Sequence, residues 1–105
     1  MERKVLIVED EPDIRELLEL TLANMGYKAN VAANLKQAYR LLDQDLYFLC
    51  LTDMRLPDGD GIELVEKIQQ EKSDLPVAVI TAFGNVEGAV NTLKAGAFDY
   101  VSKPI

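Results

Sequence analysis

The sequence contains a single cysteine, Cys50, among its 105 residues. One cysteine cannot form a disulfide within the chain, which excludes a disulfide-stabilised secreted framework and predicts a reduced, cytoplasmic setting. Cys50 lies inside an apolar run, where a free cysteine is expected to be a small core residue.

Long hydrophobic runs and basic patches are also missing. The N-terminal segment leads into an apolar stretch of only about five residues, too short for a signal-peptide core or a membrane span. Basic residues number 11 against 18 acidic ones, which gives a formal net charge of -7. A nucleic-acid surface requires a Lys/Arg patch that displaces counterions from phosphates. We therefore expect a soluble protein that contacts neither membrane nor nucleic acid.

The sequence does contain a regular alternation of apolar runs and amphipathic segments. Its length and its 49% hydrophobic content suit one core, so residues 1–105 are expected to form one domain. Strands are expected at residues 4–8, 27–31, 48–52, 77–80 and 99–102, and helices begin near Pro12, Asn34, Ile62 and Gly84. Strands that alternate with helices of about ten residues or more imply right-handed crossovers and a mostly parallel sheet with helices on both faces. This is an α/β fold.

Local signals support the first two helices. Pro12 suits a first turn, and Gly26 suits the left-handed residue that commonly ends a helix. The apolar face expected between them consists of Ile14, Leu17, Leu18, Thr21, Leu22 and Met25. In the second helix, Asn34 is a candidate N-cap, with Gln37 three residues further on.

Polar side chains follow four of the predicted strands at the point where each strand ends. They are Glu9 and Asp10, Asp53, Thr81 and Lys103. In an open parallel sheet the carboxyl ends of the strands meet at one edge, where ligands bind. Taken singly, each residue suits an ordinary loop or helix cap. Together they predict one site at the edge of the sheet.

Three carboxylates at this edge need a neutralising partner. At about 5 Å and an effective dielectric near 20, each pair would repel by roughly 3 kcal/mol. A raised pKa, the ammonium of Lys103 or a hard divalent cation could each relieve this repulsion, and oxygen donors with room for water favour Mg²⁺ together with the lysine. With Thr81 as a hydrogen-bond donor, the set suits phosphoryl transfer to Asp53, the single acid on a central strand.

At these residues the chain closely resembles the receiver domains of two-component response regulators, from Val5 to Ile105. Four motifs carry the resemblance: Val8-Glu9-Asp10-Glu11, Thr52 to Gly61, Ile80-Thr81-Ala82-Phe83 and Asp99 to Pro104. The second motif and the segment Lys94 to Tyr100 are most similar to N-terminal receivers of sigma-54-dependent activators of the nitrogen-regulatory or pilus type. The resemblance implies a flavodoxin-like, doubly wound, five-stranded parallel sheet with strand order 2-1-3-4-5.

The resemblance also implies a role for each of the site residues. The implied Mg²⁺ ligands are Glu9, Asp10, Asp53 and the backbone carbonyl of Arg55. Asp53 accepts a phosphoryl group from a sensor histidine kinase, and Thr81 and Lys103 bind the phosphate.

The output implied by the resemblance is a change of shape. Thr81 shifts toward the phosphate while Tyr100 turns inward, and new charge-assisted hydrogen bonds bias a two-state surface. The partners expected are the kinase, an attached output domain, expected to be a transcription activator, and a second copy in an active homodimer. No external substrate is turned over, so the chain is expected to be a regulatory phospho-acceptor.

Three features set this chain apart within the resemblance. Receivers carry a fifth helix after the Lys-Pro turn, and the sequence stops at Ile105, so we expect a domain truncated after its last strand that dimerises, swaps segments or is marginally stable. Arg55 and Phe83 stand at positions that tune hydrolysis of the aspartyl phosphate. Neither offers a carboxylate or amide to orient water, which predicts slow self-dephosphorylation.

Two other classes of function compete with this interpretation. Phosphohydrolases that use an aspartyl phosphate usually carry a second acid two residues after the nucleophile, where this chain has Arg55. A flavin-binding module would need a hydroxyl- and glycine-rich phosphate loop after the first strand, where Glu9-Asp10-Glu11 would repel phosphate unless a cation intervened. A receiver that signals without phosphate is disfavoured by the complete set of acids with Thr81 and Lys103.

Overall fold

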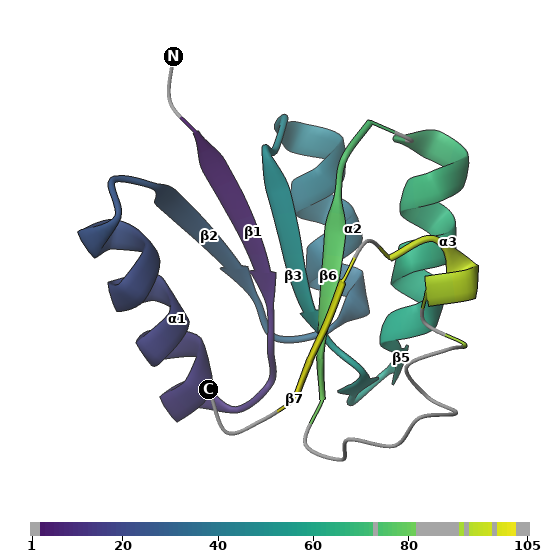
Figure 1. Ribbon diagram of the computed structural model, residues 1–105, viewed down its shortest axis with the longest axis horizontal. Coiled ribbons are helices and arrows are strands. Elements are labelled where there is room, and N and C mark those ends of the chain that lie inside the picture. Colours follow the sequence, from purple (N-terminus) through teal and green to yellow (C-terminus); the bar gives the residue numbers. More distant parts are fainter. Residues whose placement is uncertain (1–2, 73, 82–90, 92, 98, 103–105) are drawn as a thin grey trace.

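The computed structural model describes residues 3–72, 74–81, 91, 93–97 and 99–102. Its main sheet has five parallel strands in the order β2-β1-β3-β6-β7, which confirms the predicted order 2-1-3-4-5 (Figure 1). The strands are β1 (Lys4–Val8), β2 (Lys28–Ala32), β3 (Leu49–Asp53), β6 (Val77–Thr81) and β7 (Asp99–Ser102). Their carboxyl ends lie along one edge of the sheet, at the bottom of the view.

Three helices are described over their full length: α1 (Pro12–Asn24), α2 (Leu35–Gln44) and α3 (Gly61–Glu71). The expected caps are present, since the Asn34 side chain accepts a hydrogen bond from the Gln37 backbone N–H at 2.8 Å. Gly26 follows α1 with φ of +88°. The predicted fourth helix, from Gly84, falls mostly outside the described residues. No helix in the described part of the chain has the length and apolar character needed to cross a membrane.

The sheet divides the core into two unequal parts. Leu6 and Val8 of β1 point to the side covered by α2 and α3, where a large buried cluster lies. Val5 and Ile7 point to the other side and pack with Leu18 and Leu22 of α1 and with Ile80 of β6. Because neighbours along a strand face opposite sides, one unbroken apolar run serves both clusters.

Two sequence-based expectations about burial were wrong in detail. The third strand starts at Leu49, whereas Phe48 is half-exposed and stacks on Tyr27 with ring centroids 5.8 Å apart. In α1, the row Leu17, Thr21 and Met25 is exposed. The buried residues of α1 are Leu18 and Leu22, which pack against the sheet. Among the described residues no second helix packs against α1. The strand expected at residues 27–31 lies one residue later.

A small antiparallel hairpin was not expected. Directly after β3, β4 (Arg55–Leu56) pairs with β5 (Gly59–Asp60), with Arg55 opposite Asp60 and Leu56 opposite Gly59. Pro57 and Asp58 form the two-residue tip. The hairpin occupies most of the segment between Asp53 and α3, where no strand was expected.

Candidate functional site

The three predicted acids converge at the carboxyl edge of the sheet. Val8 pairs with Thr52 in the parallel register of β1 and β3, so the next residues, Glu9 and Asp53, lie side by side. One carboxylate oxygen each from Glu9, Asp10 and Asp53 lies within 4.8 Å of the others. Glu9 is 1% exposed and Asp53 7% exposed, while Asp10 is exposed. Two of the acids are therefore buried and one faces solvent.

The turn that carries Glu9 and Asp10 is fixed by three hydrogen bonds. The Glu9 N–H donates to the Ala32 carbonyl at 2.9 Å, and the Glu11 N–H donates to Oε1 of Glu9 at 3.3 Å. From α1, Nη1 of Arg15 donates to the Glu9 carbonyl at 3.1 Å. Sequence reasoning did not single out Arg15, although a base one turn into the helix that follows an acidic pair is a usable signal. Arg15 ties the helix to the acidic turn.

The acidic cluster fits a hard divalent cation. Each pair of ionised carboxylates about 5 Å apart repels by roughly 3 kcal/mol at an effective dielectric near 20. All three donors are carboxylate oxygens, the ligand type that Mg²⁺ prefers, and the exposed side of Asp10 leaves room for water ligands. The chemistry of the donor set therefore matches a magnesium site.

The remaining predicted site residues fall near the same edge or outside the described chain. Asp53 pairs with Ile80, so Thr81, the last residue of β6, lies one step beyond it. Tyr100 lies in β7 opposite Val79. The side chains of Thr81 and Tyr100, and the whole of Lys103 and Phe83, lie outside the described residues.

The backbone after Asp53 turns tightly around the site. The Met54 N–H donates to the Ile80 carbonyl at 3.0 Å, and the Gly61 N–H donates back to the Met54 carbonyl at 2.7 Å. A Cβ at Gly61 would lie 2.3 Å from the backbone oxygen of Asp53. Arg55, at the start of β4, is exposed, and its N–H is 3.5 Å from Oδ1 of Asp53. Only glycine fits at residue 61, whose N–H closes the loop that follows Asp53.

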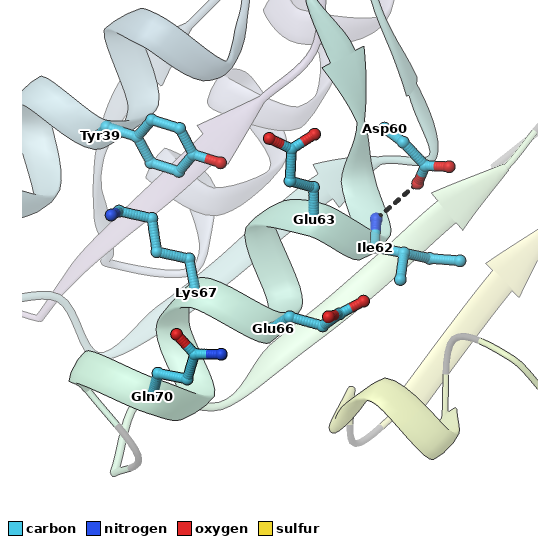
Figure 2. A pocket seen from close by; sticks show the side chains of 7 residues that line it. All are labelled: Tyr39, Asp60, Ile62, Glu63, Glu66, Lys67 and Gln70. Atoms are coloured by element: carbon cyan, nitrogen blue, oxygen red, sulfur yellow. Dashed lines mark hydrogen bonds between the residues drawn. The ribbon is translucent and has the colours of Figure 1, made fainter.

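A hollow between α2 and α3 lies apart from the three acids. Figure 2 shows its lining: Tyr39, Asp60, Ile62, Glu63, Glu66, Lys67 and Gln70. The Lys67 ammonium lies 5.0 Å from the centre of the Tyr39 ring and 3.1 Å from Glu71, whose hydrogen bond raises the pKa of Lys67. Burial and the nearby carboxylate of Glu63 raise the pKa of Tyr39. This hollow holds none of the predicted site residues.

Comparison with known proteins places these features in one family. A family model described as the response regulator receiver domain matches residues 5–105. Response regulator protein PilR of Pseudomonas aeruginosa is 55% identical over 103 residues, covering 98% of this chain and 23% of the relative. Regulatory protein AtoC of Escherichia coli is 37% identical over 101 residues, covering 96% and 22%. The chain thus spans less than a quarter of the length of these relatives.

Solved structures agree with the sequence relatives. A CheY-like response regulator receiver domain protein from Methanospirillum hungatei superposes with a TM-score of 0.94 at 30% identity, covering all of this chain and 84% of that one. The beryllofluoride-activated NtrC4 receiver domain dimer gives a TM-score of 0.92 at 33% identity, covering 97% and 84%. These matches confirm the resemblance to receivers of the nitrogen-regulatory and pilus type. With its sheet order and its acidic cluster, the chain belongs to the response regulator receiver domain family and is a phosphorylation-dependent signalling switch.

Proposed function

We propose that Asp53 is the phospho-acceptor of this switch and that Glu9, Asp10, Asp53 and the Arg55 carbonyl hold Mg²⁺ beside it. The observation that carries the proposal is the convergence of three carboxylates within 4.8 Å of one another at the carboxyl edge of the sheet. Asp53 suits the acceptor role because it is the last residue of the central strand β3, and the loop that follows it is closed by the hydrogen bond from Gly61 to Met54. Glu9 and Asp10 share one turn and suit metal binding.

The proposed chemistry is a simple displacement. A carboxylate oxygen of Asp53 attacks phosphorus, an O–P bond forms, and the P–N bond of a phosphohistidine breaks. The histidine nitrogen leaves with the electron pair as neutral imidazole, its other ring nitrogen keeping a proton. Bound Mg²⁺ would offset charge on the phosphoryl oxygens. Thr81 and Lys103 are proposed to bind those oxygens, by a hydroxyl hydrogen bond and by charge.

The proposed switch couples the acceptor to β6 and β7. Phosphorylation replaces the single negative charge of the Asp53 carboxylate with about two on the phosphoryl group, whose oxygens accept hydrogen bonds that exist only in the modified state. Thr81 ends β6, and β7, which carries Tyr100, pairs with β6 along its length. We propose that Thr81 moves toward the phosphate and that Tyr100 turns inward in response. The modified state would then present a different surface at this side of the sheet.

Residues 1–105 are proposed to act as one receiver within a longer regulator. Receiver domains pair with histidine kinases and output domains, so the proposed partners are a sensor histidine kinase, an output domain that activates transcription, and a second copy of the chain on activation. A cytoplasmic location and the absence of a turned-over external substrate are part of the same proposal. The net charge of -7 supports the absence of direct nucleic-acid contact by this domain.

The proposal is tested by phosphorylation with a small acyl phosphate. Intact mass is measured with and without Mg²⁺ for the original chain and for Asp53→Asn, and Asp13→Asn, an exposed acid in the first turn of α1, is the control. We expect one phosphoryl group on the original chain and on Asp13→Asn, only with Mg²⁺, and none on Asp53→Asn. Full labelling of Asp53→Asn would overturn the assignment.

Slow loss of the phosphoryl group is also proposed. Neither Arg55 nor Phe83 offers a carboxylate or amide that could orient a water molecule toward the aspartyl phosphate. We expect the purified, phosphorylated chain to keep its label for minutes or longer after the donor is removed. Samples are quenched with acid at intervals to time the loss. Loss of the label within seconds would contradict this expectation.

A further inference from the structure

The tip of the β4–β5 hairpin is anchored to another element of the fold. The hairpin begins two residues after Asp53 and carries Arg55 on its first strand. Its base is fixed by the Gly61 N–H, which donates to the Met54 carbonyl at 2.7 Å. Its tip, Pro57-Asp58, reaches the N-terminus of α2. The segment that carries a proposed metal ligand is therefore held at both ends.

Asp58 makes the connection to α2 with both carboxylate oxygens. Oδ1 accepts a hydrogen bond from the Leu35 N–H at 2.8 Å, and Oδ2 accepts one from the Lys36 N–H at 3.1 Å. These are the first two residues of α2, whose N–H groups have no partner within the helix. The third N–H, of Gln37, is capped locally by Asn34. The hydrogen bond from Leu35 lowers the pKa of Asp58, so the carboxylate that makes these bonds is ionised at neutral pH.

Side-chain packing reinforces the same contact. A Cβ at Gly59 would lie 2.5 Å from Cδ1 of Leu35, so the hairpin and the first residue of α2 are in direct contact. Leu56, on the opposite strand of the hairpin, is 9% exposed and belongs to the buried cluster under α2 and α3. The hairpin therefore cannot shift along α2 without breaking both the polar and the apolar contacts.

We propose that Asp58 is a positioning residue for the magnesium site: by bonding the hairpin to the N-terminus of α2, it holds the backbone of Arg55 where its carbonyl can complete the ligand set. This inference rests on the proposed function of Glu9, Asp10 and Asp53. Asp58 is not among the acids that converge at the site, and it acts through the hairpin. Partners that orient metal ligands in this way commonly contribute to metal affinity.

The test compares Asp58 with a matched cap on the same helix. Asn34→Ala removes a cap of α2 but leaves the hairpin contact, whereas Asp58→Ala removes the contact to the hairpin. Mg²⁺ affinity is measured by titration of backbone amide signals in NMR spectra, and hydrogen exchange of the Leu35 and Lys36 amides reports whether the caps are lost. Asp58→Asn, which keeps one acceptor oxygen, provides a milder variant should Asp58→Ala not fold.

We expect Asp58→Ala to weaken Mg²⁺ binding about tenfold, Asp58→Asn to have an intermediate effect, and Asn34→Ala to change affinity less than about twofold. Equal weakening by Asn34→Ala and Asp58→Ala would overturn the inference, because the effect would then come from loss of helix stability. Unchanged affinity in an Asp58 variant whose Leu35 and Lys36 amides exchange rapidly would also overturn it. Failure of the original chain to bind Mg²⁺ would instead contradict the proposed function on which the inference depends.

Discussion

At the scale of single residues, the site depends on chain geometry as much as on the reactive groups. The acids were predictable because each follows an apolar run, and parallel register then places Glu9 beside Asp53. Asp58 was not singled out, because its partners, the first N–H groups of α2, lie in another element of the fold. A side chain's local sequence does not reveal which distant backbone group it meets.

Gly61 provides a residue-scale prediction. A Cβ there would meet the Asp53 backbone oxygen at 2.3 Å, and backbone cannot move aside as a flexible side chain can. We expect Gly61→Ala to lower the free energy of unfolding by about 3 kcal/mol, near the upper end of the common range for single substitutions. Chemical denaturation measures the change.

Gly26→Ala is the matched control for this prediction. Gly26 also has positive φ, at +88°, but nothing lies within 4 Å of its added Cβ. Only the backbone conformation is then penalised, by about 1 kcal/mol. We expect Gly26→Ala to retain phosphorylation. If the two variants were equally stable, the proposed clash at Gly61 would be wrong.

At the scale of elements, sequence periodicity predicted the five long strands and the starts of the first three helices to within one or two residues. The β4–β5 hairpin was missed because strands of two residues are too short to show alternation. The apolar face of α1 was predicted too broadly. Spacing places Leu17 and Leu18 on the same side of a helix, but only contact with the sheet decides which of them is buried.

The ion pair between β1 and the end of α2 provides an element-scale prediction. Lys4 Nζ donates to Oδ2 of Asp45 at 2.5 Å, and this bond lowers the pKa of Asp45 below its usual value of 3.8. Because the folded-state pKa is the lower one, the stabilisation is fully present above the unfolded-state pKa and is lost as pH falls through the folded-state value. The coupling should therefore be present at neutral pH and absent in strong acid.

A double-mutant cycle with Lys4→Gln and Asp45→Asn measures this coupling at about pH 7 and about pH 2. Asn at residue 45 keeps the Oδ1 acceptor for the Leu46 N–H, so the cycle reports on the bond to Lys4. A favourable coupling of the same size at both pH values would contradict the assignment of the pKa shift to this pair.

At the scale of the whole molecule, the larger core lies under α2 and α3, next to the hairpin that follows Asp53. Leu64 of α3 is fully buried there, whereas Leu46, in the connection before β3, is 83% exposed. We expect Leu64→Ala to lower the free energy of unfolding by about 3 kcal/mol and Leu46→Ala to change it by less than about 0.5 kcal/mol. Thermal or denaturant unfolding of both variants would measure this, and similar losses would contradict the assigned core.

The central claim at this scale is that the fold brings three acids together so that one of them, Asp53, carries the phosphoryl group with Mg²⁺ bound beside it. The direct test locates the modified residue: the chain is phosphorylated by an acyl phosphate, reduced with borohydride, which converts an aspartyl phosphate to homoserine, and sequenced by mass spectrometry. The account predicts homoserine at residue 53 alone, and only when Mg²⁺ is present during phosphorylation. Conversion at Asp10 instead, or conversion at residue 53 that does not depend on Mg²⁺, would contradict it.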